Sequence, residues 1–332
     1  LCVMTRALIA DPDMPRKARE NRLDDIRICY GYNSGCIDRI YMGRSVTCVQ
    51  NAVVGREKEW AELPLAERPL KVVVVGGGPA GLECARVARL RGHAVVLLEK
   101  KGELGGQTLI AKRAPARQDF DGACRYSARE CETLGVDIRL GVEAEASAVL
   151  GESPDAVVLA TGARPLKPPI PGIELGTSAW EVLLGKEPSG DRVLVIDEEY
   201  GYQGTSVAEY LLDRGREVSM VTSERTIGSF LGATSAPPTF KRLFTKGVSL
   251  HCHLNVVRLE PGRAIAENVW TGREEVLAPF DAFVYAYGGE AVHDLKRSLA
   301  GRVARLELVG DAFAPRTLQH AILEGHRLAR AL

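Results

Sequence analysis

One segment, residues 71–99, constrains the fold of this chain more than any other. It opens with Val72–Val75, an apolar run typical of a parallel strand that is buried on both faces. Three glycines with the spacing G-x-G-x-x-G follow: Gly76, Gly78 and Gly81. We expect a helix over 82–91 and a second strand over 94–98 that ends at Glu99. Strand, glycine turn, helix, strand and acid in this order predict a dinucleotide-binding unit.

Each residue type in this unit has a physical role. Gly76 allows the tight turn out of the strand, Gly78 lets the backbone approach a pyrophosphate, and Gly81 lets the helix pack closely on the strand. The helix N-terminus faces the phosphates, and the Glu99 carboxylate can accept hydrogen bonds from ribose hydroxyls. The expected cofactor-binding residues of this unit are Gly76, Gly78, Pro79, Ala80, Gly81, Glu99 and Lys100.

Composition narrows the class of protein. The chain has 332 residues, 45% of them hydrophobic, which is enough for two or three packed domains. Its formal net charge is zero and it has no basic block, so we expect neither a nucleic-acid nor a membrane partner. It starts at Leu1 rather than Met, which suggests a fragment. Its eight cysteines favour ligands or buried thiols over disulfides, as in a cytoplasmic redox protein.

A second strand–turn–helix–strand unit is predicted by residues 192–221. Its turn has carboxylates where glycines should admit a pyrophosphate: Asp197-Glu198-Glu199-Tyr200-Gly201-Tyr202-Gln203-Gly204. These carboxylates repel phosphates and are expected to cap the helix themselves. We therefore expect this unit not to bind NAD(P)H.

The two units define an α/β fold class with two Rossmann-like dinucleotide-binding domains, one inserted in the other. Residues 71–165 plus 290–332 are expected to form the first domain, and residues 166–289 the second, degenerate, NAD-like domain. The Pro/Gly-rich stretch 166–190 is the predicted crossover. Residues 248–257 read as one strand, in which His251 and His253 would share a face.

Three cysteines lie in a Gly/Asn-rich loop: Cys29, Cys36 and Cys48. Such a loop is typical of an iron–sulfur or zinc site, and either site normally has four protein ligands. Spacing would place the fourth ligand at position 32, which is a tyrosine. From spacing alone, metal ligation and three unligated thiols both remain open.

The order of these motifs gives a specific resemblance. The chain resembles the C-terminal part of the multidomain members of the old yellow enzyme family, the type of trimethylamine and histamine dehydrogenases and of 2,4-dienoyl-CoA reductase. The residues that carry the resemblance are Thr5-Arg6, Ile9–Asp13, the loop from Cys29 to Cys48, Gly76–Gly81, Ala160-Thr161-Gly162 and Gly310-Asp311.

The resemblance implies a domain order: an FMN-bearing β/α barrel, a four-cysteine iron–sulfur loop, and two dinucleotide-like domains. Residues 1–28 would be the remnant of the barrel, with a strand ending at 1–4, and residues 29–70 the cysteine-rich loop and linker. Arg6 would contact the FMN phosphate. The rest of the barrel, with the catalytic residues, would be missing, so no catalytic residue is named and the isolated chain is expected to be inactive.

The resemblance also implies further cofactor contacts: Gly106, Gln107, Thr161, Gly162, Gly310 and Asp311. The adenine nucleotide would be FAD or ADP, and the contacts at 104–107 and 310–311 favour FAD. In the reductase-like loop pattern C-x2-C-x3-C-x11-C, Tyr32 replaces the second cysteine. A phenolate is a harder ligand than a thiolate, so the cluster is expected to be weakened, reduced to three irons or absent.

Three functions follow as alternatives. The first is the electron-transfer half of an FMN/iron–sulfur amine dehydrogenase that passes electrons to an external carrier such as an electron-transferring flavoprotein. The second is an NAD(P)H-dependent enoyl reductase with the opposite electron flow. The third is a non-catalytic nucleotide-binding scaffold. The expected partners are the missing barrel and further copies of the chain.

Overall fold

The computed structural model describes residues 3–332 and divides into two compact units. Unit 1 runs up to Leu109 and adds Asp119–Arg164 and Glu290–Leu332, while unit 2 comprises Ile110–Gln118 and Pro165–Gly289. The short excursion 110–118 belongs to unit 2 because Ile110 and Ala114 are buried in its core. Leu1 and Cys2 lie outside the described residues, and Val3 and Met4 form no strand, unlike the strand end expected at 1–4.

Unit 1 is built on a five-stranded parallel sheet in the order β15-β4-β1-β2-β3. Its strands are β1 (Lys71–Val75), β2 (Ala94–Glu99), β3 (Asp137–Leu140), β4 (Ala156–Leu159) and β15 (Arg305–Leu308). The four valines of β1 are at most 5% exposed, as their apolar run predicts for a central strand. The Rossmann-like sheet expected for the first unit is therefore present.

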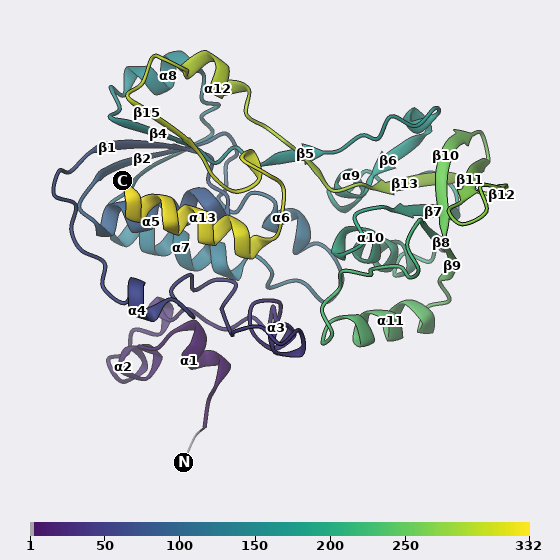
Figure 1. Cartoon of the computed structure of the whole chain (residues 1–332), viewed down its shortest axis with the longest axis horizontal. Helices are drawn as coiled ribbons and strands as arrows, with labels where there is room; N and C mark the ends of the chain where they lie inside the picture. The colour runs from purple at the N-terminus through teal and green to yellow at the C-terminus, as the bar shows by residue number, and fades with distance from the viewer. Residues whose placement is uncertain (1–2) are drawn as a thin grey trace. The chain divides into compact units, whose positions relative to one another are not determined.

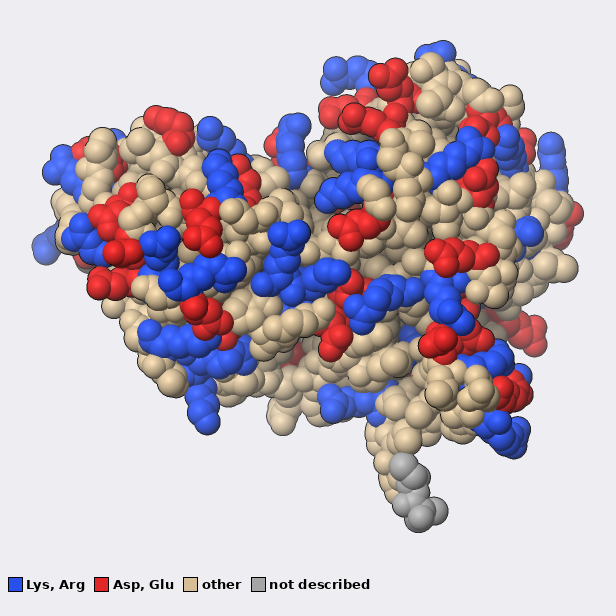
Figure 2. Space-filling view, turned by 180° about the vertical axis from the view of Figure 1, so that it is seen from behind, with Lys and Arg blue, Asp and Glu red and all other residues tan. Residues whose placement is uncertain are grey.

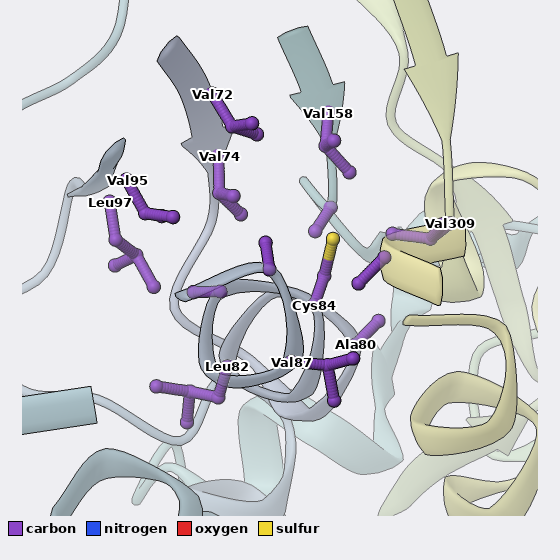
Figure 3. Close-up of a cluster of buried hydrophobic side chains, with 14 of the residues drawn as sticks. Val72, Val74, Ala80, Leu82, Cys84, Val87, Val95, Leu97, Val158 and Val309 are labelled. Carbon is purple, nitrogen blue, oxygen red and sulfur yellow. The ribbon is translucent and has the colours of Figure 1, made fainter. Parts of the chain in front are cut away.

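Three helices cover one face of this sheet (Figure 1): α5 (Pro79–Leu90), α7 (Gly122–Thr133) and α13 (Leu318–Ala331). Helix α5 packs against both of the others. A Cβ at Gly325 would lie 2.2 Å from the Ala80 carbonyl oxygen, so glycine is what lets α13 approach α5. Figure 3 shows Cys84 pointing from α5 towards the sheet, whose Val72, Val74 and Val158 belong to the same buried cluster.

The other face of the sheet packs against α8 (Ala146–Gly151) and α12 (Asp294–Leu299), through Val149 and Leu299. The N-terminal part of unit 1 carries short helices: α1 (Arg6–Ala10), α2 (Met14–Arg19), η1 (Leu23–Asp25), α3 (Ile37–Tyr41) and α4 (Glu57–Trp60). Asn51 ties this part together, because its Nδ2 donates to the Ile9 and Ala10 carbonyls at 3.2 Å each.

Unit 2 contains a second five-stranded parallel sheet, in the order β6-β13-β7-β8-β9. Its strands are β6 (Gly176–Ser178), β7 (Arg192–Asp197), β8 (Glu217–Thr222), β9 (Ser249–Cys252) and β13 (Ala282–Ala286). The helical segments are η2 (Ile173–Leu175), α9 (Ala179–Leu183), α10 (Tyr202–Leu212) and α11 (Ala236–Thr245). The predicted strand–turn–helix–strand repeat is thus confirmed at β7, α10 and β8.

The single strand expected over 248–257 is wrong. The chain breaks at His253, whose φ of 64° lies in the left-handed region and whose N–H donates to the Glu224 carbonyl at 3.1 Å. Beyond it, three antiparallel strands form a separate sheet that sequence reasoning did not predict: β10 (Leu254–Glu260), β11 (Arg263–Asn268) and β12 (Glu274–Leu277). His251 and His253 therefore do not share a strand face.

Short elements complete the chain: α6 (Thr108–Ala111), η3 (Gly310–Ala312), and β5 (Ala163–Pro165) paired with β14 (Gly289–Ala291). Within residues 3–332, no helix combines the length and apolar character needed to cross a membrane. On the face shown in Figure 2, basic and acidic side chains are interspersed, in keeping with the balanced charge.

Candidate dinucleotide site

The glycine turn of unit 1 has no room for side chains at two of its three glycines. Gly76 adopts a φ of 111°, and a Cβ there would lie 2.3 Å from the Ala160 carbonyl oxygen. A Cβ at Gly81 would lie 1.9 Å from the Gly76 carbonyl oxygen. These contacts are far shorter than any real Cβ contact, so the turn and the packing of the helix on the strand both require glycine.

Gly78 differs from the other two glycines because the space beside it is open. It precedes the first turn of α5, and the nearest atom to a Cβ there would be Gly106 Cα, at 3.9 Å. Pro79 occupies the first helical position, where its missing N–H costs no hydrogen bond. An open cradle at a helix N-terminus fits a pyrophosphate, so the residues present fit the adenine nucleotide predicted from the sequence.

Glu99 is fixed at the carboxyl end of β2, beside the same turn. Its Oε2 accepts from the Gly77 N–H at 2.7 Å and its Oε1 from the Lys101 N–H at 2.8 Å. The residue is 7% exposed, whereas Lys100 is exposed. The structure therefore brings the predicted ribose acid next to the glycine turn.

The residues that the resemblance added also meet in unit 1. Gln107 Nε2 donates to Asp311 Oδ2 at 2.9 Å, and Asp311 Oδ1 accepts from the Arg316 N–H at 3.0 Å. Burial raises the pKa of Asp311. Gly310 adopts a φ of 63°, and a Cβ there would lie 2.7 Å from Ala80 Cβ. The turns at 106–107 and 310–311 thus lie beside the start of α5.

Thr161 and Gly162 have a different setting. The Thr161 hydroxyl donates to the Val292 carbonyl, and the Val292 N–H donates to the Gly162 carbonyl at 2.9 Å. Gly162 adopts a φ of 75°. Both residues therefore hold the segment that returns from β14 to unit 1.

Sequence reasoning missed a buried charged cluster between α5 and α13. Glu83 is 2% exposed, and it accepts from Arg86 Nη2 at 2.8 Å, while His326 Nδ1 lies 2.7 Å from Glu83 Oε1. Trp60 stacks on the His326 ring with 5.1 Å between centroids. Burial alone would raise the pKa of Glu83, but Arg86 and His326 hold it well below its usual range. The sequence feature that could have revealed this cluster is the pair Glu83 and Arg86, an acid and a base three residues apart on a helix face that is otherwise apolar.

In unit 2, the corresponding turn is filled by its own carboxylates. Glu199 Oε2 accepts from the Gly201 and Gln203 N–H groups at 3.1 and 3.0 Å, as expected for a carboxylate that caps the start of α10. Glu198 binds the end of β8, accepting from the Ser223 N–H at 2.8 Å. Asp197 is fully buried, and a Cβ at Gly204 would lie 2.5 Å from its carboxyl group.

The cysteine loop lies in the N-terminal part of unit 1. Cys29, Cys36 and Cys48 are partly buried free thiols. Across residues 3–332, no three His, Cys, Asp or Glu side chains are grouped in a way that could hold a metal ion. Tyr32 donates its hydroxyl to the Phe120 carbonyl at 2.8 Å, and burial raises its pKa well above the usual range. The residues present therefore do not fit a four-ligand iron–sulfur cluster.

Arg6 lies beside this loop, and its Nη1 donates to Asn33 Oδ1 at 3.0 Å. It borders an open cavity of about 340 Å³, lined by Met4, Thr5, Arg6, Ala7, Cys29 and Gly31. Arg6, which is predicted to meet an FMN phosphate, thus lines a concave surface.

The family model described as pyridine nucleotide-disulphide oxidoreductase matches residues 70–313. The N,N-dimethylglycine/sarcosine dehydrogenase of Chromohalobacter salexigens is 39% identical over 289 residues, which are 82% of this chain and 41% of that protein.

Two solved structures resemble almost the whole chain. A 2-naphthoyl-CoA reductase has a TM-score of 0.92 and 28% identity, covering 99% of this chain and 50% of that one. The histamine dehydrogenase of Rhizobium sp. 4-9 has a TM-score of 0.90 and 26% identity, covering 99% and 54%. The chain spans about half the length of these relatives, and the resemblance to the C-terminal part of old yellow enzyme-type flavoproteins is confirmed.

Proposed function

Since the chain belongs to the pyridine nucleotide-disulphide oxidoreductase family, with oxidoreductases of the old yellow enzyme type as its homologues, we propose that it is the nucleotide-binding, electron-transfer half of an amine dehydrogenase. The observation that carries the proposal is the open cradle at Gly78, next to the fixed carboxylate of Glu99. A relative named as a dimethylglycine/sarcosine dehydrogenase supports an amine as the substrate of the complete protein.

The proposed ligand of unit 1 is an adenine dinucleotide, FAD in preference to ADP. The pyrophosphate would bind the Gly78 backbone and the α5 N-terminus, and the adenosine ribose would bind Glu99. The pair Gln107–Asp311 supports FAD, because it offers an amide and a carboxylate to the polar chain of a flavin. When bound, a flavin supplies one- or two-electron transfer. The protein's part is to hold the phosphates and to orient the ribose.

The remaining electron-transfer apparatus belongs to the proposal as well. FMN would be held in a preceding barrel, with Arg6 at its phosphate, because a guanidinium suits a phosphate dianion. The external acceptor would be a protein carrier such as an electron-transferring flavoprotein. The seven described cysteines are free thiols, which supports a reducing, cytoplasmic location.

An NAD(P)H-dependent reductase is the second candidate, and the likeness to a 2-naphthoyl-CoA reductase favours it. The capped turn of unit 2 argues against it. Glu199 occupies the N–H groups at which a nicotinamide nucleotide would place its phosphates. We rank the amine dehydrogenase first for this reason.

Two measurements on the complete protein that contains this chain test the proposal. Denaturation followed by chromatography should release an adenine nucleotide, and finding none, with no affinity for added ADP or FAD, would contradict the site. Secondary and tertiary methylamines should reduce an artificial electron acceptor in the presence of the enzyme, while NADH should not. Reduction by NADH with no response to amines would favour the reductase.

A further inference from the structure

The strongest unexplained feature outside the nucleotide site is the position of Tyr32. Iron–sulfur clusters of the four-iron type are held by four cysteine thiolates, and this loop has three cysteines and a tyrosine in the remaining place. A phenolate can serve as a ligand only if its oxygen faces the metal. The orientation of the Tyr32 hydroxyl therefore decides whether Tyr32 can be the fourth ligand of a cluster.

Tyr32 faces the protein interior. Its hydroxyl donates to the Phe120 carbonyl at 2.8 Å, and its ring meets the Phe120 ring edge-on with 5.1 Å between centroids. Tyr30 packs on the same segment, because a Cβ at Gly122 would lie 2.1 Å from the Tyr30 ring. Both aromatic side chains thus bind the loop to the chain just before α7, and the hydroxyl proton is engaged there.

Hydrogen bonds also close the rest of the loop. The Thr47 N–H and hydroxyl both donate to the Gly35 carbonyl, at 2.8 and 2.7 Å. Gln319 of α13 in turn donates to the Thr47 hydroxyl at 2.7 Å, and Gln50 donates to the Ile28 carbonyl at 2.6 Å. Thr47 and Gln50 are buried. These bonds supply the cross-links that a metal cluster gives to a loop of this kind.

We infer that residues 29–51 form a hydrogen-bonded structural loop in which Tyr32 replaces an iron–sulfur cluster by binding Phe120. Cys29, Cys36 and Cys48 are then ordinary thiols. The inference is independent of which electron acceptor or substrate the complete protein uses, because it concerns only the contacts of the loop.

The first test is the metal content of the complete protein, purified anaerobically from iron-supplied cells. The wild type should contain no more iron or acid-labile sulfide than a variant with Cys29→Ser, Cys36→Ser and Cys48→Ser. Iron and sulfide in whole-number amounts that disappear in the triple variant would overturn the inference. So would the electron paramagnetic resonance signal of an oxidised three-iron cluster.

The second test measures how much the hydrogen bond from Tyr32 to the Phe120 carbonyl stabilises the protein. Tyr32→Phe removes the hydroxyl and leaves the buried Phe120 carbonyl without its donor, so the melting temperature should fall by roughly 2–4 °C. Tyr41→Phe is the matched control, because Tyr41 is 69% exposed, and it should change nothing. Equal melting temperatures for Tyr32→Phe and the wild type would overturn the structural role.

Discussion

At the scale of single residues, the three glycines of the first turn should respond differently to substitution. Gly78→Val should fold normally, because nothing lies within 3.9 Å of the added Cβ, yet its side chain would fill the pyrophosphate cradle. We expect at least a 100-fold loss of nucleotide affinity, about 3 kcal/mol, by calorimetry with ADP or FAD. Gly81→Ala should instead fail to fold, since its Cβ meets a carbonyl at 1.9 Å. Unchanged affinity in Gly78→Val would place the nucleotide elsewhere.

The buried Glu83 gives unit 1 an acid-sensitive stability. Its pKa is lower in the folded protein than the ordinary 4.5, so the ion pair with Arg86 stabilises the fold above that pH and is lost as the pH falls below it. Glu83→Gln should cost about 3–5 kcal/mol at neutral pH, because it leaves Arg86 buried without a charge partner. Between pH 7 and pH 3, the melting temperature of the wild type should fall more steeply with decreasing pH than that of the variant. Equal slopes would contradict this assignment.

At the scale of elements, the turn between β7 and α10 predicts the opposite pH dependence for unit 2. Burial, with Glu199 nearby, raises the pKa of Asp197 from 3.8 to about 7. Between these values the folded state holds one proton more than the unfolded state, so the unfolding free energy falls as the pH rises from about 4 to about 7. A shift of about three pKa units corresponds to at most about 4 kcal/mol.

Asp197→Asn is the variant that checks this, because the amide keeps the shape and cannot ionise. It should match the wild type near pH 4 and be more stable at pH 8. In this chain Trp180 and Trp270 lie in unit 2 and Trp60 in unit 1, so the fluorescence of this chain with Trp60→Phe follows unit 2 alone. A variant that is less stable than the wild type at pH 8 would show that the carboxylate is needed in its ionised form.

Among the elements, those that depend on local residue type could be predicted from the sequence, whereas those that depend on distant contacts could not. The valine run of β1 and the glycine spacing after it predicted a buried strand and a tight turn, because both depend on local residue type. The break at His253 was not predicted, since a non-glycine residue with positive φ depends on its bond to Glu224. The contact of Glu83 with His326 was also beyond reach, because it joins residues 243 positions apart.

At the scale of the whole molecule, the two nucleotide-type turns differ in whether they leave room for a phosphate. The turn of unit 1 leaves an open cradle at Gly78 and holds Glu99 beside it, whereas the turn of unit 2 is closed by Glu199. A second anion would have to displace Glu199 from the α10 N-terminus, and like charges about 4 Å apart repel by roughly 4 kcal/mol at an effective dielectric near 20. That is half of the roughly 8 kcal/mol that binds a micromolar ligand.

We therefore expect no saturable binding of NADH or NADPH by unit 2, with any dissociation constant weaker than about 1 mM, or about 4 kcal/mol. Titration of the complete protein by calorimetry or nucleotide fluorescence measures this. The control is Gly78→Val, because any nicotinamide nucleotide that binds unit 1 would be lost in that variant. Micromolar binding that survives Gly78→Val but is lost on substitution within 197–204 would contradict the prediction, and it would make the NAD(P)H-dependent reductase the better description of this chain.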